Sequence, residues 1–215
     1  STELSGVIRG IELHKDTFLR TKHSVVKRLE SEGFPISISS ELVDQWLVQG
    51  DFLLEPQNSD IDFVVGNPPY VRQERIPAPL LDEYRQRYKT MYDRADLYIP
   101  FIERSLSLLV EGGMFCFICA DRWMKNRYGG PLREYIAEDF HLKAYIDMVG
   151  TDAFHSYVSA YPAITLITKG KVGKTRIAHK PTINKKYLST IASDMRANVL
   201  PSDSFVREMV GVVKG

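Results

Sequence analysis

The stretch Asn67-Pro68-Pro69-Tyr70 is the part of this sequence best suited to chemistry. It follows the apolar run 60–66, which predicts a buried parallel strand that ends in a glycine. Each proline fixes its own φ and holds the residue before it extended, so the loop is rigid. An asparagine oxygen beside a free backbone carbonyl can hold an NH2 group, and Tyr70 offers a flat face for a planar ring. The stretch predicts a socket for the exocyclic amine of an aromatic ring; a proline-rich turn without chemistry is the alternative.

Two acidic residues also follow predicted strands. Glu12 ends the strand expected over 7–12, and Asp51 follows a short strand expected at 46–48, with Phe52 beside it. A carboxylate at a strand tip in an α/β protein can accept hydrogen bonds from a ribose. Asp51 could accept from an adenine amino group while the Phe52 ring packs on the purine. A solvated strand end for Glu12 and an ordinary turn at Asp51 are the alternatives.

The segment after the proline loop is charged and rich in tyrosine as far as Arg94. It is expected to form a mobile surface loop and a polar helix. Arg72 and Arg75 lie next to the predicted socket, where they could meet the phosphates of a bound strand. A solvated charged surface explains the same residues equally well.

Strands and helices alternate along the chain, which favours a doubly wound, Rossmann-like α/β sheet. No glycine-rich turn precedes Glu12, so the first strand corresponds to the second strand of a nucleotide-binding fold and the sheet is expected to be incomplete. A domain is expected over 1–170, with a linker or the start of another domain over 171–215. The other expected elements are a helix from Asp16 or Thr17 to Gly33, a loop over 34–45 with a short helical turn, a helix from Asp96 to Gly112-Gly113, a strand over 114–120, a helix over 131–139, and strands over 142–148 and 163–169.

Composition restricts the remaining function classes. With 215 residues, 44% of them hydrophobic, the chain can bury a full core, and a net charge of +1 means that any DNA-binding surface must be a local patch. The sequence has no long apolar run and no signal-peptide pattern, so an intracellular, cytoplasmic protein is expected. Cys116 and Cys119 lie three apart on a predicted strand and point to opposite faces, which favours core packing over metal or disulfide chemistry. His155 is expected at the surface, and no metal site is predicted.

Five motifs occur in an order that resembles a known enzyme family. They are Gly10 to Leu13, Gly50 to Phe52, Gly66 to Val71, Asp96 to Phe101, and Gly112 to Phe115. Over about residues 7–170 the series is similar to the amino-methyltransferases of restriction–modification systems, of the N6-adenine type with the gamma motif order. The Asn-Pro-Pro-Tyr motif alone also occurs in glutamine- and RNA-guanine-modifying relatives, so a methyltransferase for those substrates stays open, as does a non-catalytic scaffold.

The resemblance implies S-adenosylmethionine as the cofactor. Glu12 would hold the ribose hydroxyls, Asp51 and Phe52 the adenine, and Phe101 would pack nearby. The family's glycine-rich first motif and its separate target-recognition domain have no counterpart here, which implies the catalytic part of a larger methyltransferase. Its partners would be double-stranded DNA, the missing amino-terminal segment and that recognition domain.

The resemblance also assigns the target base. Asn67 and the carbonyl of Pro68 would accept the two hydrogens of the adenine N6 amine, with Pro69 completing the rigid loop. Tyr70 would stack on the flipped adenine. Phe154 corresponds to the second aromatic of the family, with Tyr157 as the alternative, and Arg72 and Arg75 would lie near the DNA backbone.

Overall fold

The computed structural model describes residues 2–152 and 161–211. Contacts between Cα atoms divide the chain into two compact units, residues 1–57 and residues 58–215, and each is described by itself. The sequence predicted a boundary near residue 170 instead, between a catalytic domain and a linker or further domain. That functional division stays a prediction.

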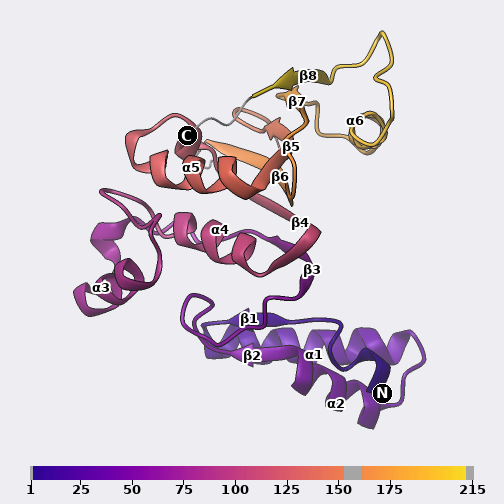
Figure 1. The fold of residues 1–215 in the computed structure, drawn as a ribbon. Coiled ribbons are helices and arrows are strands. Elements are labelled where there is room, and N and C mark those ends of the chain that lie inside the picture. The colour runs from indigo at the N-terminus through magenta and orange to yellow at the C-terminus, as the bar shows by residue number, and fades with distance from the viewer. Residues whose placement is uncertain (1, 153–160, 212–215) are drawn as a thin grey trace. The chain divides into compact units, whose positions relative to one another are not determined.

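The first unit is a two-stranded parallel sheet with two helices (Figure 1). Its elements are a 3-10 turn η1 (Thr2–Leu4), strand β1 (Gly10–Glu12), helix α1 (Lys15–Ser31), helix α2 (Ile36–Trp46) and strand β2 (Leu47–Gln49). The registers pair Glu12 with Gln49, so β1 and β2 end at the same edge of their sheet. A buried Trp46 donates its indole N–H to the Leu4 carbonyl at 2.8 Å, which fastens the amino-terminal turn to α2.

Helix α2 differs from the sequence expectation, which placed a loop with only a short helical turn over 34–45. The buried positions Leu42, Val43 and Trp46 follow the spacing of a helix face. Three serines among its residues weaken the helical propensity of the segment and hide this period. Helix α1 begins at Lys15 after a non-capping His14, so the predicted cap at Asp16 or Thr17 is wrong and both residues lie in the first turn.

The second unit is a six-stranded sheet in the order β3-β4-β6-β5-β7-β8. Its strands are β3 (Ile61–Gly66), β4 (Leu109–Ala120), β5 (Phe140–Asp147), β6 (Pro162–Lys169), β7 (Lys174–His179) and β8 (Arg207–Val210). The pairings make β3, β4, β5 and β7 run one way, and β6 and β8 the other. Strands β7 and β8 lie beyond residue 170, so the sheet continues across the boundary predicted there.

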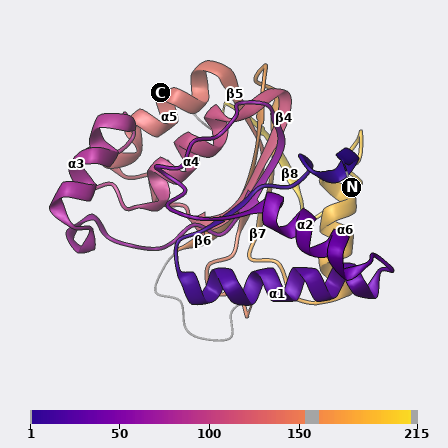
Figure 2. The ribbon, with the colours of Figure 1, turned by 90° about the horizontal axis from the view of Figure 1, so that it is seen from below.

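Helices lie on both faces of this sheet. They are α3 (Ala78–Arg87), α4 (Tyr98–Ser107), α5 (Gly130–Asp139) and α6 (Lys185–Asp194), with 3-10 turns η2 (Gln73–Arg75), η3 (Arg122–Met124) and η4 (Arg127–Gly129). Figure 2 shows α4 and α5 on one side of the strands and α6 on the other. The expected doubly wound α/β architecture is therefore confirmed.

The junction between α4 and β4 is the main difference from the sequence expectation in this unit. The helix was expected to begin with an Asp96 cap and to continue to Gly112-Gly113, but it begins at Tyr98 and ends at Ser107, and its N-cap is Leu97 without a side-chain bond. Strand β4 already pairs at Leu109, and its register with β3 shifts before Met114. Gly112 has a φ of 78°, so the glycines form an irregularity inside a long strand instead of a helix end.

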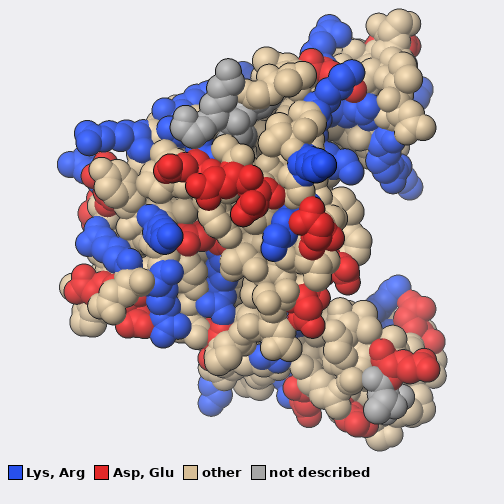
Figure 3. All heavy atoms as spheres, viewed as in Figure 1, with Lys and Arg blue, Asp and Glu red and all other residues tan. Residues whose placement is uncertain are grey.

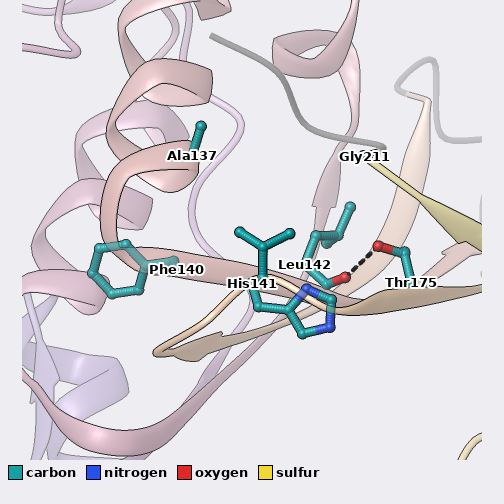
Figure 4. Close-up of a pocket in the computed structure, with 7 residues that line it drawn as sticks. Ala137, Phe140, His141, Leu142, Thr175 and Gly211 are labelled. Atoms are coloured by element: carbon teal, nitrogen blue, oxygen red, sulfur yellow. Dashed lines mark hydrogen bonds between the residues drawn. The ribbon is translucent and has the colours of Figure 1, made fainter.

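A small concavity lies at the amino ends of β5 and β7, and Figure 4 shows residues that line it. Thr175 donates its hydroxyl to the Leu142 carbonyl at 2.6 Å across this junction. The Gly173 N–H lies 3.2 Å from Nδ1 of His141, so Nε2 carries the proton and donates to the Lys174 carbonyl at 3.1 Å. Desolvation lowers the pKa of His141; the bond to Lys174 opposes this shift, and the charge of Lys143 adds to it.

Replacing His141 with glutamine is expected to flatten the acid side of the stability curve. A lowered folded-state pKa means that the unfolded chain binds more protons, so the His141 contribution is present above about pH 6.5 and is lost as the pH falls through the folded pKa. Denaturant midpoints across that range should fall less in the variant than in the wild type. The exposed His23 on α1, changed to glutamine, is the control, and equal slopes for wild type and His141→Gln would contradict the assignment.

Candidate active site

The Asn67-Pro68-Pro69-Tyr70 loop leaves the carboxyl end of β3 as predicted, directly after Gly66. The prediction that this strand is buried is wrong, because β3 is an edge strand and Phe63 and Val65 are 64% and 78% exposed. Pro68 is buried, whereas Asn67 and Pro69 are exposed. Gly66 pairs with Phe117 of β4, and a Cβ at Gly66 would lie only 2.9 Å from Cε1 of that ring. The loop is therefore anchored by one proline and a close strand contact, which leaves the Asn67 amide at the surface.

Tyr70 is held on the neighbouring strand. Its hydroxyl lies 3.5 Å from the Ile118 carbonyl of β4, to which it donates, and 42% of the residue is exposed. Desolvation, and to a smaller extent the neighbouring Cys119, raises the pKa of Tyr70 to about 12. The phenol is thus neutral at physiological pH, and part of its ring is accessible for stacking.

The segment that follows the loop is fixed to helix α4. The Val71 carbonyl accepts the Leu97 N–H at 2.9 Å, at the start of the helix. Further along, Glu103 accepts both the amide and the hydroxyl of Thr90, at 2.9 and 2.6 Å, and Arg104 donates to the Tyr88 hydroxyl at 2.7 Å. The expected polar helix is α3, but the residues after it, predicted as mobile surface, pack on α4.

Arg72 and Arg75 are both exposed beside the loop, and Figure 3 shows Lys and Arg side chains interspersed with acidic ones around α3. Arg72 lies near Asp96, which precedes α4. Desolvation raises the pKa of Asp96; Arg72 opposes this rise, Glu74 adds to it, and Arg122 opposes it. The candidate phosphate contacts thus stand in a charged neighbourhood that also includes an arginine from the end of β4.

Glu12 and Asp51 lie at the carboxyl ends of the two parallel strands of the first unit. Glu12 accepts the His14 N–H at 2.8 Å through Oε1, and its carbonyl accepts the Gly50 N–H at 3.1 Å. Asp51 accepts the Leu53 N–H at 2.8 Å through Oδ1, so it opens a turn. Two half-buried carboxylates at one sheet edge can accept hydrogen bonds from ribose hydroxyls and from an amino group.

The remaining predicted aromatic residues lie in different parts of the chain. Phe52 follows Asp51 and is half-buried, and Phe101 is a half-buried residue of α4 in the second unit. Phe154 and Tyr157, the candidates for the second stacking ring, lie outside the described residues, and so does His155.

Residues that the sequence reasoning missed lie at the carboxyl end of β4. Asp121, which is 6% exposed, accepts a hydrogen bond from the Tyr145 hydroxyl at 2.7 Å. Desolvation and the Asp121 hydrogen bond both raise the pKa of Tyr145. The hydroxyl oxygens of Tyr98 and Tyr128 lie 3.1 Å apart and share a hydrogen bond. Asp121 directly follows a predicted strand, so the rule that selected Glu12 and Asp51 could have found it.

The two cysteines lie on β4, with Cys119 buried and Cys116 half-buried, and both thiols are free. Desolvation, together with the neighbouring Asp121, raises the pKa of Cys119 to about 12, so the thiol is an unreactive core group. Within residues 2–152 and 161–211 no group of three His, Cys, Asp or Glu side chains is placed to hold a metal ion. In the same part of the chain, no helix combines the length and the apolar character needed to cross a membrane.

Comparisons with known proteins identify the family of the chain. Residues 12–154 match the model of the Eco57I restriction-modification methylase family. The chain is 60% identical over 214 residues to the type II methyltransferase M.PaeR7I of Pseudomonas aeruginosa, covering 99% of this chain and 37% of that protein. It is 48% identical over 216 residues to the type II methyltransferase M.XhoI of Xanthomonas vasicola, covering 99% and 40%. The chain thus spans less than half the length of these relatives.

A solved structure has a similar fold. A crystal structure from Listeria monocytogenes, described as a class I S-adenosylmethionine-dependent methyltransferase, superposes with a TM-score of 0.55 at 16% identity, over 83% of this chain and 60% of that one. This family and this fold imply S-adenosylmethionine as the cofactor. The family match covers most of the chain, including Glu12, the proline loop and β4, and the chain therefore belongs to the Eco57I restriction-modification methylase family.

Proposed function

We propose that the full-length protein is an S-adenosylmethionine-dependent DNA methyltransferase that modifies the N6 amine of adenine, and that this chain supplies the residues that bind the amine. The observation that carries the proposal is the geometry of the proline loop. Its asparagine is exposed, its first proline is buried, and its tyrosine hydroxyl lies 3.5 Å from a carbonyl of the next strand. The relatives, which are named type II methyltransferases, support the wider assignment.

The carboxylates of the first unit would hold the cofactor, which supplies a methyl group on a sulfonium. One carboxylate oxygen of Glu12 accepts a hydrogen bond from the His14 N–H, and the carboxylate would also accept hydrogen bonds from the ribose hydroxyls. Asp51 would accept from the adenine amino group, and Phe52 would pack on the purine. The roles of Glu12 and Asp51 follow from the chemistry of a strand-tip carboxylate. The cofactor role that the resemblance assigns to Phe101 stays a prediction.

The proline loop would bind the target amine. The nitrogen of an adenine amine is a poor nucleophile because its lone pair is delocalised into the ring. The Asn67 Oδ1 atom and the Pro68 carbonyl would accept its two hydrogens, which favours the geometry that frees the lone pair and stabilises positive charge on the nitrogen. Because Pro68 and Pro69 hold the two acceptors rigidly, positioning of the amine would account for most of the acceleration of methyl transfer. The proton can leave after transfer, so no strong general base is needed.

A base inside a duplex cannot reach such a loop and would have to be flipped out. Stacking on Tyr70, worth about 1–3 kcal/mol per base, would offset part of the lost pairing, and Phe154 would supply the second ring. Arg72 and Arg75 would contact backbone phosphates beside the loop. These interactions distinguish the nucleic-acid assignment from modification of a small amine.

The product of methyl transfer tests the proposal directly. We expect the full-length protein, given tritiated S-adenosylmethionine and mixed-sequence duplex DNA, to place label in N6-methyladenine after digestion to nucleosides. Label in a methylated cytosine would contradict the adenine assignment, and label only in protein or RNA would contradict DNA as the substrate. No transfer and no heat of cofactor binding in calorimetry would instead favour a non-catalytic scaffold.

A further inference from the structure

One exposed arginine at the carboxyl end of β4 is held in place by an aromatic ring. The guanidinium carbon of Arg122 lies 4.8 Å from the centroid of the Tyr161 ring. Both residues are exposed, and Tyr161 exposes 48% of its surface. An arginine whose guanidinium lies over an aromatic ring can still donate its N–H groups to a phosphate.

The backbone fixes both partners of this stack. Strands β4 and β6 pair as far as Ala120 and Pro162, and the Asp121 N–H donates to the Tyr161 carbonyl at 3.0 Å. Asp121 and Tyr161 therefore extend the sheet ladder by one bond, and Arg122 follows as the first residue of η3. Because the sheet positions them, the stack loses little conformational entropy when a ligand binds.

The stack stands close to the candidate amine-binding loop. The Tyr70 hydroxyl lies 3.5 Å from the carbonyl of Ile118, four residues before Arg122 in the chain, so the Cα atoms of Ile118 and Arg122 are at most about 14 Å apart. A nucleotide and two long side chains can fill that span. Arg122 and Arg72 both lower the pKa of Asp96, so both guanidinium groups lie within electrostatic reach of that carboxylate.

Internal ion pairing does not account for Arg122. Over residues 2–152 and 161–211 Arg122 forms no salt bridge; its guanidinium lies over the Tyr161 ring and within electrostatic reach of Asp96. By contrast, Arg176 on β7 forms a salt bridge with Glu208 on β8. A guanidinium that forms no salt bridge in the described part of the chain keeps N–H donors for an anion from outside.

We propose that Arg122, oriented by Tyr161, binds a backbone phosphate of the DNA strand whose base is flipped into the Asn67 loop. This assignment rests on the proposed function and adds a phosphate contact from β4 to those expected from Arg72 and Arg75. A phosphate carries no sequence information, so the contact sets the position of the strand and contributes equally at every sequence.

Substituting Arg122 with glutamine in the full-length protein is expected to weaken binding of mixed-sequence duplex DNA about tenfold. Loss of one phosphate contact should also make the slope of log K against log salt shallower by about 0.9, measured by fluorescence anisotropy. Tyr161→Leu should lose part of the affinity because the guanidinium is no longer oriented, whereas Tyr161→Phe keeps the ring and should behave as wild type. S-adenosylmethionine affinity should not change.

Arg207→Gln is the matched control. Arg207 is an exposed arginine on β8, four strand spacings or about 19 Å across the sheet from β4, and its loss should leave the slope unchanged. An unchanged slope for Arg122→Gln, or a loss of cofactor affinity in place of DNA affinity, would overturn the proposal. In either case continued methylation of adenine by the wild type would leave the proposed function intact, and the slope is measurable whether or not methyl transfer occurs.

Discussion

Asn67→Ala in the full-length protein is expected to lower the rate of methyl transfer by about 100- to 1,000-fold. The substitution removes one of two acceptors that are aimed at a charge developing on the amine nitrogen, and the Pro68 carbonyl alone cannot fix the orientation of the NH2 group. The loop itself should persist, because its anchors are the buried Pro68 and the bond from Tyr70 to Ile118. The loss should therefore appear in the chemical step and not in stability.

Single-turnover methylation with saturating DNA and cofactor measures that step. Cofactor affinity, determined by calorimetry, should stay within about twofold of wild type because Asn67 is not assigned to the cofactor. Asn58→Ala provides the control, since Asn58 is an exposed asparagine that precedes β3. A variant that retained more than about a tenth of the wild-type rate would remove Asn67 from the chemistry, and equal losses in both variants would indicate a general effect on folding.

Several local patterns were strong enough to be interpreted correctly from sequence. An apolar run that ends in a glycine and two prolines leaves few backbone choices, so the exit of the Asn67 loop from β3 could be predicted. The positions of Glu12 and Asp51 beside strand ends were also predicted, and the parallel pairing of β1 with β2 places both at one sheet edge, while their cofactor roles stay predictions. In these cases the residues and their neighbours in the chain determine the result.

Features that depend on distant contacts were missed. Nothing near Arg122 in sequence indicates Tyr161, because the two meet only when β4 and β6 pair antiparallel. The same holds for Asp121 and Tyr145, which come from β4 and β5, on either side of β6. Gly112 and Gly113 also lie within β4 and form an irregularity there, although paired glycines usually predict the end of a helix. Tertiary pairing decided each of these features, and a single sequence contains no direct record of it.

Gly129→Ala is expected to destabilise the protein by about 3 kcal/mol or more. Gly129 ends the turn η4, directly before α5. A Cβ at this position would lie 2.6 Å from both the Cα and the carbonyl carbon of Trp123, and closer still to its carbonyl oxygen. The obstacle is backbone, which cannot rotate away as a side chain can. Trp123 is also fully buried, and its carbonyl is bonded to Arg133 at 2.7 Å, so the neighbour has little freedom to shift.

The adjacent glycine is a control that separates this clash from general glycine effects. A Cβ at Gly130 would meet no atom nearer than 3.8 Å, and its φ of −51° is helical. Gly130→Ala should therefore be neutral or stabilising by up to about 1 kcal/mol, because alanine has less backbone entropy to lose. Equilibrium denaturation of both variants measures the difference. Since the residues between Trp123 and Gly129 follow directly after Arg122, any displacement that accommodates alanine at 129 should also disturb the stack on Tyr161. Equal stabilities for the two variants would mean that the turn accommodates a Cβ at position 129 without a cost in free energy.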